Sequence, residues 1–340
     1  MKNTTTIFDI LETFLTEEEV KKVSESLGYV DTARKFTLYD LIKFFIAAAA
    51  NGYKSYRHGI ENMELVGLAY VDYSTISKKA ADVNYEICKT LFEIIVSKCN
   101  RQIRRILKLP KQLAAVDSTT ITVGENRLKW AKFKGKKSGI KLHAALNINE
   151  FTPEKVIETI ASKHDGPIGE KLIDTNSILV EDRAYGNHKR FDMFKEIGQS
   201  FVIRIKNNIV LSQSKKLKSF REENSSVVRD ITCCLGTKKI ADIYKERWKV
   251  ETFFKFIKQN LNIKRLFGTT QNAVYNQLFI SLITYVLLHF TYIQTTENLK
   301  YVKLSLIQFI RRLLNNRLEI EVYISIYNSL AAYHVHDRQV

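Results

Sequence analysis

Cysteine, proline and glycine are scarce in this chain of 340 residues, which holds 4 Cys, 3 Pro and 13 Gly. So few prolines and glycines exclude collagen-like chains and proline-rich linkers. The cysteines are Cys88, Cys99 and the adjacent Cys233 and Cys234, and none of them has metal-ligand spacing. Because adjacent cysteines rarely bridge each other, we expect free thiols in a reducing cytosol.

The sequence also lacks a hydrophobic run long enough to span a membrane. Its most apolar stretch, LFISLITYVLLHF at 278–290, is shorter than the roughly 20 residues that a span needs, and it includes Ser281 and Thr284. The first residues, MKNTTTIFDILETF, have no apolar segment before their first acid, unlike a signal peptide. We therefore predict a buried core helix at 278–290 and a cytoplasmic protein with no membrane partner.

Acidic residues are few relative to basic ones, since 53 Lys and Arg against 36 Asp and Glu give a formal net charge of +17. Hydrophobic residues make up 45% and charged ones 26%, which is typical of a folded globular protein rather than a disordered one. The positive charge favours an anionic partner, either nucleic acid or a membrane surface. No basic amphipathic helix with aromatic residues opposite favours the membrane, so we expect nucleic acid.

Residues 7–108 predict helices only. Apolar residues follow a 3.6-residue period from Phe8 to Leu15, and Thr16 and Thr37 stand where helix caps are expected. A short helix is expected at 55–61, and one long helix from Asp72 to about residue 105. The first turns of that long helix carry the residue types with which a recognition helix contacts a DNA groove, namely Ser74, Thr75, Ser77, Lys78 and Lys79. A capped, solvated helix start is the alternative.

From residue 113 the pattern changes to strands and then to strands alternating with helices, which predicts a mixed α/β sheet. The predicted strands are 113–121, 139–148, 155–161, 177–182 and 200–206, with helical segments at 169–172 and 188–197. Helices follow at 240–262, 273–293 and 299–329. These elements predict an N-terminal helical domain at 1–108, an α/β catalytic domain at 109–290 with a polar insertion at about 207–236, and a C-terminal helical region at 291–340.

One predicted helix, 240–262, carries a polar stripe beside an apolar face. At 100° per residue the stripe members fall within about 60° of arc; they are Tyr244, Arg247, Glu251 and Lys258. Arg247 and Lys258 lie roughly 6 Å and 10 Å along the axis from Glu251, so we expect them to contact phosphates separately from any metal at the acid. Trp248 lies off the stripe, which favours packing over base stacking.

Two further acids lie at strands, where acids are rare unless they are paired or bind metal. Asp117 interrupts the strand AAVDSTTI, and Asp182 directly follows the strand SILVE. Together with Glu251 they fit a ribonuclease-H-like sheet, in which three carboxylates converge on two Mg²⁺ or Mn²⁺ ions. Asp174 and Glu181 are the rivals for the second acid, but Glu181 alternates to the other strand face and Asp174 precedes the strand.

These residues resemble the insertion-sequence-four (IS-four) type of DDE transposase. The signature is Tyr244-x2-Arg247-x3-Glu251-x6-Lys258, and AVDSTTI, WAKFKGKKSGIKLH and VEDRAYGNHKRF are also similar to that family, over roughly residues 110–290. Members usually carry a β-rich insertion between the second acid and the glutamate. Here only 69 residues (251 − 182) separate Asp182 from Glu251, so the insertion is short.

The resemblance implies a role for each matched residue. Asp117, Asp182 and Glu251 would bind the metal ions and catalyse the reaction. The residues that would contact DNA are Tyr244, Arg247, Lys258, Trp130, Lys132, Lys134 and Arg183. Lys132 and Lys134 belong to a segment, 129–143, with six lysines and no acid, for which a solvated loop is the alternative. His143, in the same segment, lies near the site or is a satisfied sheet residue.

The implied function is cut-and-paste DNA transposition. Inverted-repeat ends would be cleaved in a metal-dependent reaction and joined to target DNA by a homodimer acting at the nucleoid of a prokaryote. Two alternatives stay open. One is a ribonuclease-H-like nuclease without strand transfer, and the other is a decayed or domesticated copy that only binds DNA.

Overall fold

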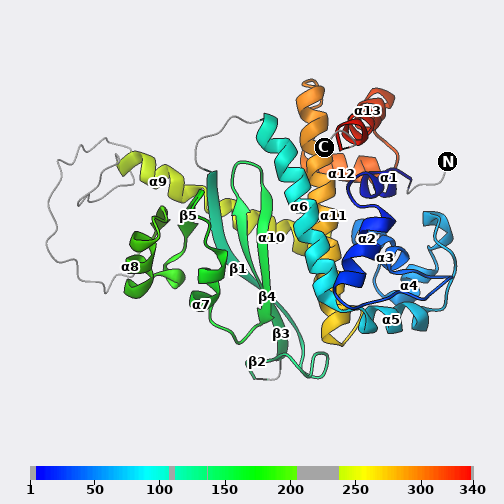
Figure 1. The fold of residues 1–340 in the computed structure, drawn as a ribbon, viewed down its shortest axis with the longest axis horizontal. Helices are drawn as coiled ribbons and strands as arrows, with labels where there is room; N and C mark the ends of the chain where they lie inside the picture. The colour runs from blue at the N-terminus through cyan, green and yellow to red at the C-terminus, as the bar shows by residue number, and fades with distance from the viewer. Residues whose placement is uncertain (1–4, 107–111, 136, 205–236, 338–340) are drawn as a thin grey trace, which may run out of the picture. The chain divides into compact units, whose positions relative to one another are not determined.

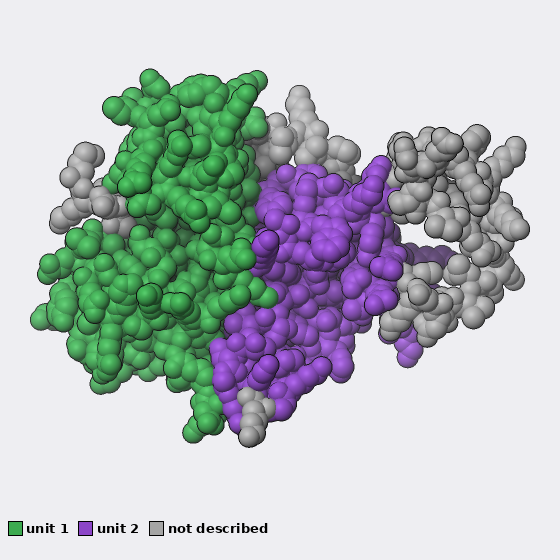
Figure 2. Space-filling model, turned by 180° about the vertical axis from the view of Figure 1, so that it is seen from behind, with its two compact units in different colours: residues 1–106, 126–130, 256–340 green, residues 107–125, 131–255 purple. Residues whose placement is uncertain are grey.

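A computed structural model describes residues 5–106, 112–135, 137–204 and 237–337. The chain forms two compact units (Figure 2). Unit 1 comprises residues 1–106, 126–130 and 256–340, and unit 2 comprises residues 107–125 and 131–255. Unit 1 thus combines segments from both halves of the sequence.

Unit 1 is built from helices. In chain order these are α1 (Thr5–Phe14), α2 (Glu17–Ser26), α3 (Leu38–Asn51), α4 (Tyr56–Ile60), the 3₁₀ turn η1 (Glu64–Val66), α5 (Tyr73–Asp82), α6 (Tyr85–Ile106), α11 (Gln271–Asn298), α12 (Leu306–Leu314) and α13 (Ile320–Asp337). The predicted caps at Thr16 and Thr37 are confirmed, since each side chain accepts the backbone N–H three residues on in a capping box. The third predicted helix, α4, begins after its cap Ser55.

Helix α11 forms the core of unit 1. The helix is longer than the apolar run 278–290 and, contrary to the expectation from that run, is long and apolar enough to cross a membrane; however, 83% of its apolar 18-residue window is buried inside the protein. Aromatic rings of α6 pack on it, with Phe92 6.0 Å from Phe279 and Tyr85 4.9 Å from Tyr275 between ring centroids. The prediction of a buried core helix at 278–290 is therefore confirmed. Cys88 and Cys99 are buried free thiols on α6, as expected, whereas Cys233 and Cys234 lie outside the described residues.

The predicted long helix from Asp72 is wrong, because the chain breaks at Val83 and Asn84 into α5 and α6. The break is stabilised by Asn276 of α11, whose amide donates to the carbonyls of Val83 (2.8 Å) and Ala80 (3.2 Å). These carbonyls lie at the end of α5, where no helical N–H reaches them. A tertiary contact therefore ends the helix, and periodicity alone could not predict it. Similarly, the predicted helix at 299–329 is two helices, α12 and α13.

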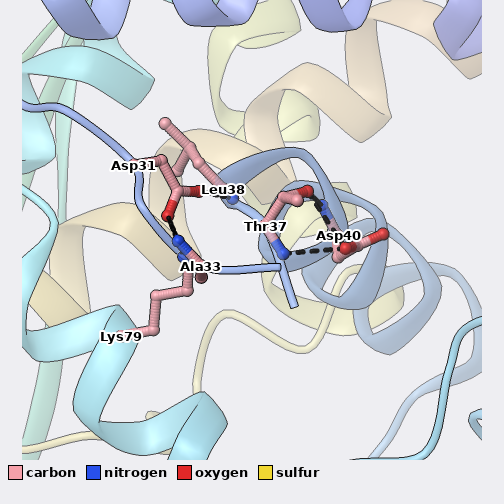
Figure 3. Close-up of polar contacts among 6 residues, drawn as sticks. All are labelled: Asp31, Ala33, Thr37, Leu38, Asp40 and Lys79. Carbon is pink, nitrogen blue, oxygen red and sulfur yellow. Dashed lines mark hydrogen bonds and ion pairs between the residues drawn. The ribbon is translucent and has the colours of Figure 1, made fainter. Parts of the chain in front are cut away.

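The segment between α2 and α3 is tied to α5 by Asp31 (Figure 3). One carboxylate oxygen of Asp31 accepts from Lys79 Nζ at 2.7 Å and from the Ala33 N–H at 3.1 Å, and the other accepts from the Leu38 N–H. Lys79 is only 9% exposed. The interpretation of Lys79 as a DNA-groove residue is therefore wrong, because its ammonium faces inward onto Asp31.

Unit 2 contains a mixed six-stranded sheet (Figure 1). Its strands are β1 (Gln112–Gly124), β2 (Lys132–Phe133), β3 (Lys137–Asn147), β4 (Thr152–Ile160), β5 (Ser177–Glu181) and β6 (Phe201–Ile203). The main strand order is β4-β3-β1-β5-β6: β3 is antiparallel to both β1 and β4, β5 is parallel to β1, and β6 is parallel to β5. This order and these directions are those of a ribonuclease-H-like sheet, which confirms the predicted fold class. The short β2 was not predicted.

The helical elements of unit 2 are α7 (Asp165–Gly169), the 3₁₀ turns η2 (Glu170–Leu172) and η3 (Arg183–Tyr185), α8 (His188–Glu196), α9 (Thr237–Lys245) and the start of α10 (Trp248–Asn260). A core of apolar side chains from β1, β5 and α8 includes Val116, Leu179 and Phe194. The predicted insertion at 207–236 lies outside the described residues.

The predicted helix at 240–262 is wrong in one respect that matters for the site, since it is two helices that meet at Glu246 and Arg247. Backbone hydrogen bonds there change to i→i+3, with Arg247 N–H donating to Tyr244 (3.1 Å) and Val250 N–H donating to Arg247 (3.1 Å). The tighter turn changes the helical phase between Tyr244 and Glu251. It also places Glu251 in the first turn of a new helix.

Candidate active site

The sheet register brings Asp117 and Asp182 to the same level on neighbouring strands. In the parallel pair β1 and β5, Val116 lies opposite Glu181, and the next residue on each strand is the predicted acid. Asp182 follows the last residue of β5 and precedes η3, so it lies at the carboxyl end of the strand. Each acid therefore directly follows a buried strand residue and is itself half-buried.

Glu251 reaches the same place from α10. Its position in the first helical turn is favourable for an anion, because the helix dipole is positive at that end. Behind it, Val250 and Phe253 are fully buried and anchor the helix start. The apolar face predicted beside the polar stripe thus has the packing role expected of it.

Arg247 joins two of the three acids. Its Nη1 lies 3.2 Å from Asp117 Oδ2 and its Nη2 lies 2.6 Å from Glu251 Oε1. The residue is only 8% exposed. The expectation that Arg247 acts at a distance from the acids is therefore wrong: the side chain folds back onto them instead of extending along the helix axis.

The surroundings of Asp117 also change the pKa of its carboxyl. Burial raises the pKa of the Asp117 carboxyl, while the Ser118 N–H and Arg247 lower it. Glu251 and Asp182 raise the pKa of Asp117 further, because a second negative charge disfavours ionisation. Glu251 and Asp182 are thus each close enough to Asp117 to interact with it electrostatically, and a cation beside Asp117 would relieve the repulsion.

Carboxylate oxygens are the ligands that Mg²⁺ and Mn²⁺ prefer, so the chemistry of the donors fits such an ion. Within the described part of the chain, however, no group of three or more His, Cys, Asp or Glu side chains has the spacing of a metal site. The guanidinium of Arg247 lies between Asp117 and Glu251, which gives a physical reason for their separation.

The other predicted DNA-binding residues are distributed over both units. In unit 2, Arg183 is exposed directly after Asp182, Lys132 and Lys134 are exposed, and the Tyr244 ring lies 5.8 Å from the Arg247 guanidinium. In unit 1, the Trp130 indole N–H donates to the Thr269 carbonyl at 2.8 Å.

Lys258, the last member of the predicted stripe, also belongs to unit 1. Burial, and secondarily the charge of Lys264, lower the pKa of its ammonium. Two lysines near each other form a cationic patch that suits a phosphate.

Trp248 differs from its predicted packing role. Its side chain is 62% exposed, and its ring lies 5.5 Å from the Arg247 guanidinium. The offset of Trp248 from the polar stripe suggested burial, but the turn at Glu246 and Arg247 directs the ring outward. An exposed indole beside clustered acids is available for stacking.

The rivals for the second acid have local structural contacts. Asp174 accepts from the Asn176 N–H and the Ser177 hydroxyl within its own turn. Glu181 is fully buried and pairs with Arg190 Nη2 at 2.7 Å. Arg190 also donates to the carbonyls of Tyr185 and Gly169. These contacts leave Asp182 as the acid beside Asp117.

One polar cluster in unit 2 was missed. Asp165 Oδ1 accepts from Ser118 Oγ (2.9 Å) and Lys141 Nζ (3.1 Å) and lies 3.4 Å from His143 Nδ1. His143 is fully buried, and its Nε2 contacts Thr159 Oγ1 at 3.0 Å. His143 is a buried sheet residue whose Nε2 has a hydrogen-bond partner, whereas its Nδ1 has none among the described residues. Asp165 had no sequence signal, because it stands alone in a predicted loop.

Sequence comparisons identify relatives of the chain. The family described as "Transposase DDE domain" matches residues 108–287. The "Probable transposase for insertion sequence element IS5377" of Geobacillus stearothermophilus is 45% identical, over 94% of this chain and 94% of that protein. The "Putative transposase for insertion sequence element IS4SA" of Synechocystis sp. is 26% identical, over 64% of this chain and 71% of that protein.

A search of solved structures finds the piggyBac transposase synaptic complex with hairpin DNA. It has a TM-score of 0.48 and 11% identity, and it covers 95% of this chain and 84% of that one. The family match spans the sheet with Asp117 and Asp182 as well as both helices that carry the polar residues, and the 45% identity extends over nearly the whole chain. The chain therefore belongs to the DDE transposase family.

Proposed function

We propose that this transposase cleaves the inverted-repeat ends of an insertion-sequence element and joins them to target DNA. The proposal depends on one observation: Asp117 and Asp182 are adjacent in register, and Glu251 reaches Asp117 through Arg247. Three acids, one on β1, one directly after β5 and one on α10, would supply the carboxylate donors for phosphodiester chemistry with divalent metal.

The proposed metal ligands are Asp117, Asp182 and Glu251, and the proposed metal is Mg²⁺ or Mn²⁺, as a pair of ions. When bound, such a pair activates the attacking oxygen and stabilises the leaving one. The chain's own residues position the DNA. Arg183 and Tyr244 lie beside the acids in unit 2, and Lys258, Trp130, Lys132 and Lys134 supply further contacts to the strand.

The proposed partners are the double-stranded inverted-repeat ends and the target DNA. A homodimer holding two ends is the proposed assembly, and the bacterial cytoplasm, at the nucleoid, is its proposed location. The net charge of +17 supports binding to a polyanion.

The test is incubation of the full-length protein with inverted-repeat DNA and Mg²⁺, with nicking, hairpin formation and strand transfer scored separately. Asp117→Asn, Asp182→Asn and Glu251→Gln should each abolish cleavage and leave DNA binding within about threefold, because phosphate contacts elsewhere carry most of the affinity. Asp174→Asn is the matched control, since Asp174 stabilises only its own turn. It should cleave at the wild-type rate.

Each other outcome identifies a different function. Cleavage without strand transfer would indicate a nuclease. DNA binding without cleavage by the wild type would indicate a copy that has lost its chemistry. Loss of activity in Asp174→Asn with retention in Asp182→Asn would contradict the choice of the second acid.

A further inference from the structure

The Arg247 guanidinium occupies carboxylate oxygens that the proposed function assigns to metal. It contacts Asp117 Oδ2 through Nη1 and Glu251 Oε1 through Nη2, so one planar group bridges a strand and a helix. The other oxygen of Asp117, Oδ1, already accepts the Ser118 N–H at 2.7 Å. A cation that binds Asp117 therefore meets either Arg247 at Oδ2 or a backbone donor at Oδ1.

The negative charges around Asp117 also favour replacement of the guanidinium by a divalent cation. Asp117 and Glu251 carry two negative charges when ionised, and Asp182, which follows β5 beside Asp117, adds a third. One guanidinium neutralises only part of this charge, whereas a divalent ion neutralises more and accepts oxygens from several ligands at once. Both cations cannot occupy the same oxygens, because they would repel each other at contact distance.

Two aromatic rings border the Arg247 guanidinium in its observed position. It lies 5.8 Å from the Tyr244 ring and 5.5 Å from the Trp248 ring, so these rings would still attract the cation after it leaves the carboxylates. Its Nε is buried without a hydrogen-bond partner among the described residues. A buried donor without a partner costs free energy, which offsets part of the stabilisation that the two ion pairs give in this position.

We propose that Arg247 and a divalent cation compete for Asp117 and Glu251, so that metal binding releases the guanidinium to a DNA phosphate. Arg247 thereby sets the metal affinity of the site in addition to contacting DNA. The inference rests on the proposed function, because it needs the acids to be metal ligands. It predicts reciprocal coupling, in which metal strengthens the phosphate contact and a phosphate on Arg247 strengthens metal binding.

The experiment measures Mn²⁺ binding to the full-length protein without DNA, by electron paramagnetic resonance of the free ion. Arg247→Met removes the competing charge and keeps much of the volume. We expect its dissociation constant for Mn²⁺ to fall about tenfold, because an ion pair no longer has to be broken. Arg247→Lys keeps the positive charge but loses the two-pronged guanidinium. Its dissociation constant for Mn²⁺ should therefore lie between those of Arg247→Met and the wild type.

Lys245→Met is the matched control, because it removes one positive charge two residues earlier from an exposed side chain paired with Asp242. It should leave Mn²⁺ affinity within about twofold, since an exposed charge is screened by solvent. An unchanged or weakened affinity in Arg247→Met would overturn the competition, and would show that the guanidinium only holds the acids together. Thermal melts of each variant establish that the protein folds.

A second measurement separates this inference from the proposed function. Asp117→Asn and Glu251→Gln should each weaken Mn²⁺ binding at least tenfold. If they do not, the acids are not the metal site and the proposed function itself fails. If they do and Arg247→Met binds no more tightly than wild type, the site stands and only the competition is wrong.

The coupling to DNA is tested with Ca²⁺, a divalent cation that binds carboxylates and allows binding to be measured with little cleavage. In the wild type, Ca²⁺ should tighten binding to inverted-repeat DNA about fivefold, because it frees the guanidinium. Arg247→Met should show a smaller gain, of less than about twofold. An equal gain in both proteins would contradict release of Arg247 to phosphate.

Discussion

His143 lies fully buried in the sheet of unit 2, between a hydroxyl and a carboxylate. Burial lowers the pKa of its imidazole to about 4, which outweighs the opposing effect of Asp165; the nearby ammonium of Lys141 lowers the pKa further. A folded-state pKa below the unfolded value of about 6.5 means that the unfolded chain binds the extra proton between these pH values. The folded state therefore loses stability as the pH falls from about 6.5 to about 4.

The stability of the protein should therefore depend on pH in this window, and a variant without His143 should depend on it less. The free energy of unfolding should fall by at most about 1.4 kcal/mol per pH unit in this window because of His143. His143→Asn, which does not titrate there, should show a smaller slope in urea denaturation at pH 4, 5 and 6.5. His164→Asn is the matched control, because His164 is exposed in the same unit. Equal slopes in wild type and His143→Asn would show that His143 is not kept neutral.

At the scale of elements, the short helix α7 supports the segment that carries Asp182. Its last residue, Gly169, accepts from Arg190 through its carbonyl at 3.1 Å, and Arg190 also bonds Glu181 and the Tyr185 carbonyl on either side of Asp182. A Cβ atom at Gly169 would lie 2.7 Å from the Tyr185 ring and 2.8 Å from Arg190. Glycine is required here for the close approach of Arg190.

Gly169→Ala should therefore destabilise the protein by about 1–3 kcal/mol, the usual cost of overpacking a buried position. Gly166→Ala, on the same helix, is the control: an added Cβ there meets no atom within 4 Å, and alanine favours a helix by about 0.5–1 kcal/mol. Urea denaturation followed by circular dichroism compares the two. A similar loss of stability in both variants would show that the position of Arg190 does not require a glycine at residue 169.

The elements themselves could largely be predicted, because hydrophobic period and caps are local signals. Thr16, Thr37 and Ser55 each begin a helix as expected, and five of the predicted strands appear near their places. Hydrophobic period and caps could not predict where the helices break. The break at Val83 depends on Asn276, which is nearly two hundred residues away in sequence. The turn at Arg247 depends on contacts that its side chain makes with a strand.

The residues of the candidate site are likewise of two kinds, those that the sequence predicts and those that only the fold reveals. Spacing and strand position sufficed to single out Asp117, Asp182 and Glu251, because acids stand out against apolar strands. The bridge made by Arg247 and the exposure of Trp248 follow from a backbone turn that no periodicity predicts. Arg190 and Asp165 carry no signal in the sequence, since each matters only through partners brought close by the sheet.

At the scale of the molecule, the net charge of +17 predicts salt-dependent binding to DNA. The logarithm of the binding constant should fall linearly with the logarithm of salt concentration, with a slope of about −0.9 per phosphate contacted. Lys132→Gln combined with Lys134→Gln should reduce the magnitude of that slope by about 2, as measured by fluorescence anisotropy between 50 and 300 mM salt (roughly the range over which such slopes are resolved).

The control for this prediction is Lys21→Gln combined with Lys22→Gln. These exposed lysines pair with Glu25 and Glu18 on their own helix, so the slope should stay as in the wild type. A nearly flat salt dependence of the wild type would exclude an interface dominated by phosphates.

Unit 1 is built from segments at both ends of the sequence, which leads to a further prediction. Within unit 1, α3, α5 and α6 pack on α11, which lies at Gln271–Asn298. A fragment of residues 1–108 would expose the apolar surfaces that Phe92 and Tyr85 bury on that helix. It should show little cooperative thermal unfolding by circular dichroism. A sharp transition would show that the N-terminal helices fold without α11.

The late position of α11 also has a consequence for synthesis on the ribosome. The last of the N-terminal helices, α6, ends at Ile106, and α11 begins at Gln271, so 164 residues (271 − 106 − 1) are made between them. A chain that ends before α11 would leave the apolar faces of α3, α5 and α6 uncovered, so we expect proteases to cleave it faster than the full-length protein. Because α11 follows Asp117, Asp182 and Glu251 in the sequence, we expect unit 1 to complete its core only after all three acids have been synthesised.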